Sequence, residues 1–405
     1  MHIRICGIFL ALLSFATLAA PAPGDAKAAT SARPEYGVLY TAWIRAGDPQ
    51  ATVRIRLSRN AGWVRWLRLQ APPDRYTQIK GSGTITREGE QILWRPAGKT
   101  PWLQYNVNLE SKRESGRFDG MVTADWGIFR ADDLAPVVRA DMEDGTQSRA
   151  KLSLNLPDGW GAATPYPAYA SGRLKIDNPR KIFDRPAGWM AIGKLGVRRE
   201  RIGDTRVTIA APTAQGVRRM DTLAFFRMTL PALQGIFPGF TERLLVVSAG
   251  DPMWRGALSG PGSLFVHADR PFISENGTST FLHELVHVAM RARSRPDSDW
   301  IVEGLAEYYS LEVLHRSGAL SDARFEKAHA SLATWAAEAP SLDVPHSTGP
   351  VTAKAVGALR AIDREIRSAS KGRKSLDDVA RALAEADEAV TRARFDTLVA
   401  AAKKG

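Results

Sequence analysis

The most informative stretch of the sequence is His283-Glu284-Leu285-Val286-His287. It lies in a segment of helical character that runs to about Ala292, and Thr278 or Ser279 can cap its start. Histidines four residues apart stand on the same face of a helix, one turn above the other. Both imidazoles can therefore reach one metal ion, with Glu284 close enough to hydrogen-bond with a metal-bound water. We predict that His283 and His287 are metal ligands and that Glu284 is the catalytic base.

The neighbouring residues favour this interpretation over its alternative, a solvated helix surface that carries the same pattern by chance. They make the helix apolar nearly all round, which predicts that it is buried: Phe281, Leu282, Leu285, Val286, Val288 and Ala289. Two histidines and a glutamate in a buried helix need partners, because unpaired buried polar groups are costly. A metal ion supplies one.

A second helix is expected after the polar turn 291–299, capped by Ser298 or Asp299 and containing the stretch 300–309. A turn of this length lets the second helix fold back antiparallel against the first. Glu303 and Glu307 then face the two histidines together. Glu303 would complete a zinc site with an open fourth position for water, and Glu307 would accept the free N–H of a ligand histidine. The alternative for each glutamate is a surface carboxylate.

Between these glutamates, Gly304 is expected where the two helices approach closely. With its neighbours it forms Glu303-Gly304-Leu305-Ala306-Glu307-Tyr308-Tyr309, and this sequence after the histidine motif resembles the gluzincin metallopeptidases, above all the glycyl aminopeptidase-like family. Segments 354–363 and 375–379 resemble later helices of that family, and 156–160 resembles part of its β domain. The resemblance implies zinc as cofactor, a β-rich N-terminal domain and a thermolysin-like catalytic domain, without the family's usual PDZ domain.

Two departures from the family pattern concern the substrate. The loop in which relatives carry an acid that anchors the substrate amine reads Arg255-Gly256-Ala257-Leu258-Ser259-Gly260. It contains no acid, although Asp251 or Glu307 could substitute. The tyrosine that stabilises the oxyanion in relatives is also absent, since no tyrosine follows Tyr309. His346 could donate in its place, and the alternative is a solvated loop histidine.

The N-terminus predicts export. Residues 1–28 combine a basic start, an apolar run and an Ala26-Lys27-Ala28 cleavage site, the layout of a secretory signal peptide; an uncleaved anchor is the alternative. The only cysteine, Cys6, lies inside this segment, so no disulfide is expected and a bacterial periplasm is favoured. No later stretch is apolar and long enough to span a membrane, so we expect a soluble mature chain without stable membrane insertion.

The remaining chain predicts two domains and an α+β fold. Region 34–212 alternates apolar and polar residues, as in Leu103–Leu109, and reads as a β-rich, antiparallel domain of the sandwich or saddle type. Region 213–405 reads as the mostly helical catalytic domain. A helix is expected over 216–236 with an interruption at Pro231. Strands are expected over 243–248 and 263–268, with a loop over 256–262 between them.

Charge and tryptophan content allow a second interpretation, in which the β-rich region binds a ligand. The formal net charge is +12, but there is no Arg/Lys run with interleaved aromatics, so no nucleic-acid partner is expected. Eight of the eleven tryptophans lie in the β-rich region and either form core or line a carbohydrate or peptide groove.

These features predict a zinc-dependent peptidase acting on peptides or proteins, with strand 263–268 pairing with the extended substrate. Its rivals are a non-catalytic zinc-containing relative and a basic envelope-binding protein. The second rival requires one continuous Arg/Trp face on the β domain. The sequence does not predict the oligomeric state.

Overall fold

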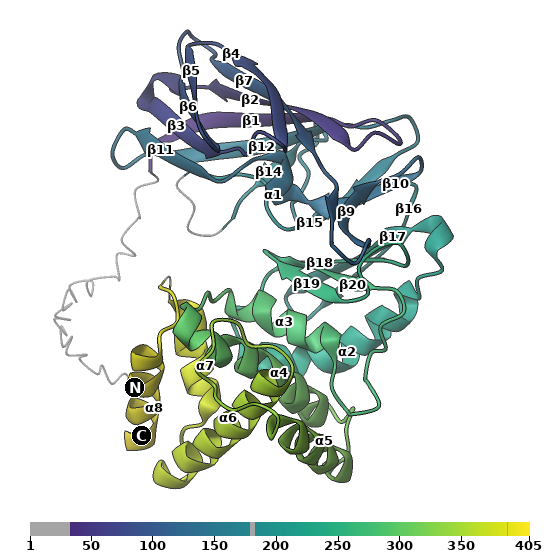
Figure 1. Ribbon diagram of the computed structural model, residues 1–405, viewed down its shortest axis with the longest axis vertical. Helices are drawn as coiled ribbons and strands as arrows, with labels where there is room; N and C mark the ends of the chain where they lie inside the picture. Colours follow the sequence, from purple (N-terminus) through teal and green to yellow (C-terminus); the bar gives the residue numbers. More distant parts are fainter. Residues whose placement is uncertain (1–32, 179–182, 387) are drawn as a thin grey trace, which may run out of the picture.

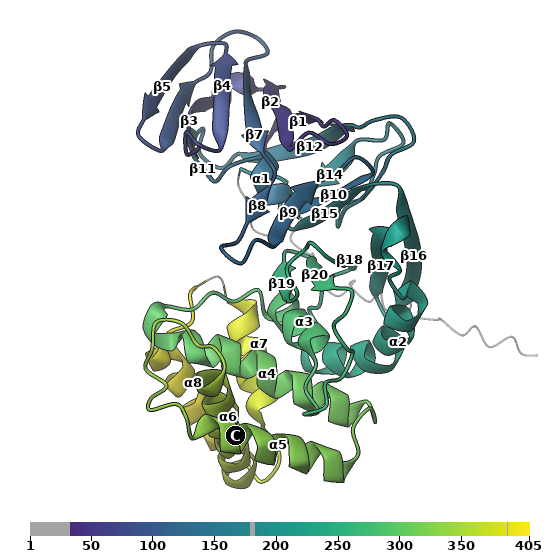
Figure 2. The same cartoon turned by 45° about the vertical axis from the view of Figure 1, so that its right-hand side comes forward.

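A computed structural model describes residues 33–178, 183–386 and 388–405, so the predicted signal peptide and Cys6 lie outside the described residues. Strands dominate the N-terminal region and helices the C-terminal region, which confirms the α+β class (Figure 1). A mixed layer of strands and helices lies between them (Figure 2). Within the described part of the chain, no helix has the length and apolarity needed to cross a membrane.

Two sheets pack face to face in the N-terminal region. The six-stranded sheet has the order β14-β12-β1-β2-β7-β4, with β1 (Glu35–Trp43), β2 (Gln50–Ser58), β4 (Tyr76–Gly81), β7 (Trp102–Asn108), β12 (Gln147–Asn155) and β14 (Leu174–Ile176). The four-stranded sheet has the order β11-β3-β6-β5, with β3 (Val64–Gln70), β5 (Thr84–Glu88), β6 (Gln91–Arg95) and β11 (Val138–Met142). Alternating side chains of both sheets form one apolar core, including Val38, Ile55, Leu69 and Trp94. Pairing is antiparallel except between β1 and β12, which run parallel.

A third sheet connects this sandwich to the rest of the chain. Its order is β13-β15-β10-β9-β8, with β8 (Ser111–Lys112), β9 (Phe118–Val122), β10 (Trp126–Arg130), β13 (Gly161–Ala163) and β15 (Trp189–Gly193). The short helix α1 (Ala131–Leu134) follows β10. The β8–β9 hairpin reaches the C-terminal region, where the Phe118 N–H donates to Pro252 O and the Trp254 N–H donates to Phe118 O.

The fourth sheet forms the base of the candidate site. Its order is β16-β17-β18-β20-β19, with β16 (Leu195–Ile202), β17 (Thr205–Pro212), β18 (Arg243–Ala249), β19 (Ala257–Gly260) and β20 (Ser263–His267). The predicted boundary at 212/213 falls after β17, and β17 pairs with β18 across it. Part of the predicted loop 256–262 is strand β19, which is the last strand of this sheet. Gly188, Trp189 and Arg130 contact β19 but form no strand ladder with it.

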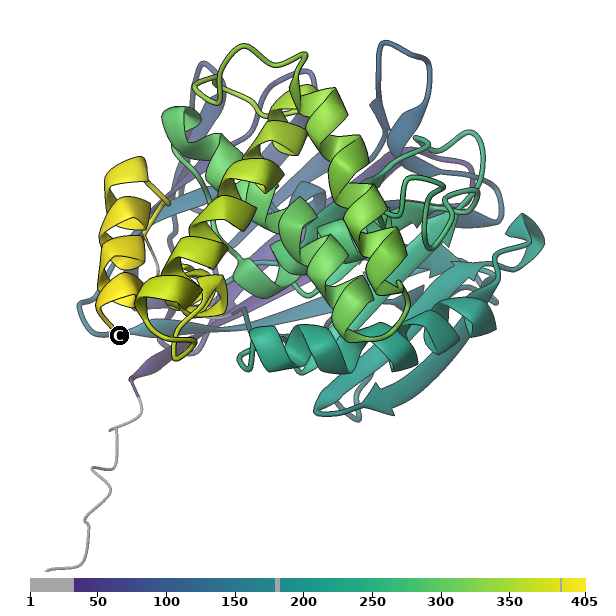
Figure 3. The same cartoon turned by 90° about the horizontal axis from the view of Figure 1, so that it is seen from below.

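The helices lie below this sheet and pack on one another (Figure 3). They are α2 (Arg219–Ile236), α3 (Thr280–Met290), α4 (Asp299–Arg316), α5 (Asp322–Ala336), α6 (Pro350–Ala369), α7 (Leu376–Glu385) and α8 (Arg392–Lys404), with the 3₁₀ turns Ala61–Trp63, Thr213–Gln215 and Pro296–Ser298. The prediction that Pro231 interrupts its helix was wrong, because α2 continues through Pro231. Pro231 lies on the exposed side of α2, where water can satisfy the carbonyl that loses its donor, while Leu230 and Leu233 hold the other side in the core.

Candidate metal centre

Helix α3 presents the two histidines as the sequence predicts. Ser279 caps the helix, with its Oγ accepting from the Leu282 N–H at 3.4 Å. The apolar side chains around the motif are buried, as expected. His283 and His287 keep 18% and 17% of their side chains exposed, so the face that they share is reachable from solvent.

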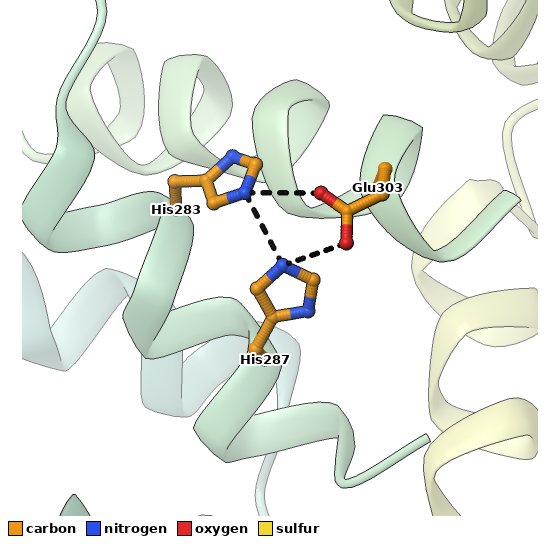
Figure 4. Close-up of side chains that lie close together, drawn as sticks. All are labelled: His283, His287 and Glu303. Atoms are coloured by element: carbon orange, nitrogen blue, oxygen red, sulfur yellow. Dashed lines mark hydrogen bonds and ion pairs between the residues drawn. The ribbon is translucent and has the colours of Figure 1, made fainter. Parts of the chain in front are cut away.

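Helix α4 brings Glu303 to this face, on the side opposite α3 (Figure 4). Its Oε2 lies 3.4 Å from His283 Nε2, and its Oε1 lies 3.4 Å from His287 Nε2. The two Nε2 atoms are 3.2 Å apart. One ligand atom from each of the three residues fits within 4.8 Å of the others.

Gly304 serves a different helix contact from the one expected. A Cβ at this position would lie 2.6 Å from the Ala355 Cβ and 3.0 Å from Leu359 Cδ1, both on α6. The close approach is therefore between α4 and α6. Because α6 fixes α4 from behind, Glu303 is held on the side that faces α3.

Glu307 holds His283 in the predicted way. The His283 Nδ1–H donates to Glu307 Oε2 at 2.9 Å, which leaves Nε2 directed at the group formed with His287 and Glu303. Burial lowers the pKa of His283, but hydrogen bonds to Glu303 and Glu307 outweigh that effect and raise the pKa well above its ordinary value. Burial likewise raises the pKa of Glu303, and hydrogen bonds from both histidines outweigh it and hold the pKa well below its usual range.

The donor set fits a zinc ion. Two imidazole nitrogens and one carboxylate converge on one point, and these are the ligands of catalytic zinc sites that keep an open position. A metal ion would replace the protons through which the two Nε2 atoms contact Glu303, because a ligating imidazole nitrogen carries no proton. The Glu307 contact fixes one histidine from outside the ligand set, as carboxylates do around bound zinc.

Glu284 is half-buried next to His283 on α3. Among the residues that the structure describes, it forms no hydrogen bond or ion pair. A carboxylate beside the group formed by His283, His287 and Glu303 that is not engaged elsewhere is available to accept a proton.

The structure leaves His346 outside the cluster of ligand atoms. It is exposed on the loop between α5 and α6, and it has no hydrogen-bond or ion-pair partner among the described residues. The next residue ties the loop to α4, since the Ser347 N–H donates to Asp299 Oδ2 at 2.7 Å. Asp299 also accepts from Ser294 Oγ at 2.8 Å and lies one helical turn before Glu303. Sequence reasoning missed this anchor because its three partners are separated along the chain.

The expectation that strand 263–268 pairs with a substrate is contradicted by the sheet order. β20 lies between β18 and β19, so both of its edges are occupied. The free edge belongs to β19, where Ser259 O accepts from Arg130 Nη1 at 3.1 Å. No sequence pattern indicated Arg130, which comes from the N-terminal region.

Both acids that could replace the missing amine anchor are engaged. Asp251 accepts from Arg255 at 3.1 and 2.5 Å and also pairs with Arg117. The hydrogen bonds from Arg255, and to a smaller extent that from Arg117, hold the pKa of Asp251 well below its usual range. Glu307 is bound to His283.

Comparison with known proteins supports the architecture. No family model matches the chain, and no curated protein matches it. Among solved structures, the chain is similar to an aminopeptidase N family protein from Idiomarina loihiensis, with a TM-score of 0.63 and 14% sequence identity. The match covers 86% of this chain and 70% of that chain. At this level of identity, the likeness shows a shared fold.

Proposed function

We propose that this protein is a zinc metallopeptidase of the gluzincin type, with a thermolysin-like catalytic region, exported to the bacterial cell envelope. The observation that carries the proposal is the convergence of His283, His287 and Glu303 beside the unpaired carboxylate of Glu284. The fold shared with an aminopeptidase N family protein supports peptide hydrolysis. The signal-peptide pattern of residues 1–28 supports export and a periplasmic location.

The residues of the site divide the chemistry among them. When bound, zinc supplies a Lewis acid and lowers the pKa of a coordinated water to about 7. Glu284 accepts the proton of the attacking water and returns it to the leaving nitrogen. Glu307 orients His283. His346 is proposed to donate to the developing oxyanion, from the loop that Ser347 ties to Asp299.

An extended substrate is proposed to add to the free edge of β19. His267 N–H donates to Gly256 O at 2.9 Å, so the alternation of an antiparallel ladder directs the backbone groups of Ala257 and Ser259 away from β20. Arg130 already occupies Ser259 O, which leaves Ala257 to pair with the substrate. Helix α3 packs against β19, which brings this edge close to the metal-ligand helix.

The test is the Glu284→Gln variant, which keeps the shape of the side chain and removes its basicity. Cleavage of a fluorogenic peptide library should fall about 100- to 10,000-fold. Zinc content, measured by mass spectrometry of the purified protein, should remain one per chain. Full zinc without cleavage by the unmodified protein would instead favour the non-catalytic zinc-containing relative, and unchanged turnover in the variant would exclude Glu284 as the base.

A further inference from the structure

The outer face of the six-stranded sheet, far from the metal centre in the fold, carries lysine, arginine and tryptophan side chains. This face points away from the sandwich core, and its positions are exposed or half-buried. The strand registers align its side chains in three rows across the strands. The rows are Lys175-Lys151-Leu39-Arg56-Trp102, Ser153-Thr41-Arg54-Gln104-Lys80 and Asn155-Trp43-Thr52-Asn106-Thr77.

These rows carry positive charge without a carboxylate. Five of the positions are lysine or arginine, and none is aspartate or glutamate. Lys175 has an acidic neighbour at the margin, Asp177 at 3.3 Å. Arg54 and Arg56, at the centre, form no ion pair with any of the described residues. At the margin of the same face, Glu35 pairs with Arg149 at 3.5 Å, so the face keeps a net positive charge at its centre.

Arg54 is held in a fixed position between two tryptophans. Its guanidinium carbon lies 5.5 Å from the ring centroid of Trp43 and 5.0 Å from that of Trp102. Its Nε and Nη2 donate to Gln104 Oε1 at 3.0 and 2.7 Å. Nη1 has no such partner in the described chain and remains available for a ligand.

A shallow, open depression of about 680 Å³ lies beside this cluster. Trp43, Thr52, Arg54 and Gln104 line its sheet side, and the segments 44–46 and 155–157 line its rim. Its volume is within the range of small-molecule and sugar-sized sites. None of the residues that line it is acidic.

We propose that this face binds an acidic polysaccharide. Trp43, which is 38% exposed, offers an apolar ring surface for a sugar ring. Amides and hydroxyls at Asn106, Thr52 and Asn155 can both donate to and accept from sugar hydroxyls. Arg54 and Arg56 meet the carboxylates of the polymer, and arginine can bind a carboxylate through two parallel hydrogen bonds.

The other occupants fit less well. A peptide would add to a sheet edge rather than lie across its face. A neutral glycan would leave the central arginines unpaired. Single-stranded nucleic acid needs several open aromatic faces for successive bases, whereas Trp43 is the only exposed aromatic side chain in the three rows.

Binding of the full chain to polygalacturonate, measured by calorimetry, tests the proposal, with dextran and oligo(dT) as comparison ligands. Polygalacturonate should bind, and its affinity should fall with added salt, because screening reduces the contribution of charge to binding. Dextran should not bind measurably. Failure of polygalacturonate to bind, equal binding of dextran, or tighter binding of oligo(dT) would each overturn the proposal.

Paired variants separate the face from the overall charge. R54A/R56A should weaken polygalacturonate binding about tenfold. R198A/R199A removes the same charge from two exposed positions on β16 and should leave the affinity within about twofold. Arg56 has no hydrogen bond within the described chain, so R56A alone tests the face even if R54A disturbs packing. Equal weakening by both pairs would show that net charge alone drives binding.

Discussion

The metal centre and the outer sheet face place their polar groups in opposite ways. Five of the six groups proposed to build the metal centre come from two consecutive helices, and its ligand atoms fit within 4.8 Å of one another. The sheet face spreads its charged and aromatic groups over six strands that lie between residues 35 and 176. The first arrangement is half-buried and packed around a point, whereas the second is open and extended.

This difference predicts different responses to substitution. At the metal centre each ligand completes one coordination shell, so the loss of one group disables the set. On the sheet face each exposed charge contributes a small, screened amount, so effects should be graded and nearly additive. The predictions below test that contrast, beginning with the largest effect.

Loss of a ligand should abolish tight zinc binding. Glu303→Ala removes the carboxylate that both histidines contact, and His283→Ala removes one imidazole. Each purified variant should contain close to no zinc by mass spectrometry, compared with one per chain in the unmodified protein. The expected loss exceeds any single change on the sheet face.

Matched substitutions away from the site provide the control. Glu326→Ala alters a carboxylate on α5 that pairs with Arg360, and His315→Ala alters an imidazole that bonds to Asp322. Both should keep full zinc. Zinc retained at one per chain by the Glu303 and His283 variants would refute the ligand assignment.

A smaller effect on metal affinity is expected for Glu307, which contacts a proposed ligand rather than the metal itself. Glu307→Gln replaces the charged acceptor of His283 Nδ1–H by a neutral one of the same size. Removing such a partner lowers metal affinity about 10- to 100-fold, which a competition titration with a chelating dye can measure. Glu312→Gln, on the same helix but paired with Arg316, should leave the affinity unchanged. An unaltered affinity in Glu307→Gln would mean that the contact does not support a bound metal.

The sequence predicted the convergence of His283, His287 and Glu303 because its signals are local. The spacing of His283 and His287 fixes a common helix face, and the turn after it returns Glu303 to that face. Segment 375–379 was also read as part of a helix, and α7 begins there with a capping box between Ser375 and Asp378. The prediction that Gly304 lies at a close approach of α3 and α4 was wrong. The helix that approaches Gly304 is α6, which lies more than forty residues further along the chain.

The sheet face and the substrate edge could not be read in this way. Alternation shows that Arg54 and Arg56 share a face of their strand, but not which strands lie beside them. The rows exist only because β1 pairs with β12, about a hundred residues away, and β2 pairs with β7. The short strand β19 was read as loop because Gly256 precedes it and Gly260 ends it, and its pairing with β20 overrides their low strand preference.

The two regions should also be independent. R54A/R56A should leave zinc content and cleavage of a short peptide within about twofold of the unmodified protein, because distant sites without shared partners act additively. Glu303→Ala should leave polygalacturonate affinity within the same range. Combining the three substitutions in one chain and measuring binding checks additivity. A loss of polymer affinity on metal removal would show that the regions are coupled.

The smallest expected effect concerns the N-terminus of the substrate. An aminopeptidase pairs the free, charged α-amine with a carboxylate, because burying an unpaired ammonium group is costly. Here Asp251 is held by Arg255 and Arg117, and Glu307 is held by His283. Arg130, bound to Ser259 O on β19, adds a positive charge near the proposed substrate edge. We therefore expect an N-acetylated peptide to be cleaved at least as well as its free counterpart.

A matched pair of fluorogenic peptides that differ only in N-acetylation measures this ratio of kcat/KM. The Asp251→Asn variant sharpens the test, because it removes the acid closest to the loop in the sequence and breaks the ion pairs of Asp251 with Arg255 and Arg117. If Asp251 served as amine anchor in spite of its two arginine partners, this variant would lose activity on the free peptide only. A strong preference of the unmodified protein for the free amine would contradict the expectation, since it would require one of these arginine-paired or histidine-paired carboxylates to be released when substrate binds.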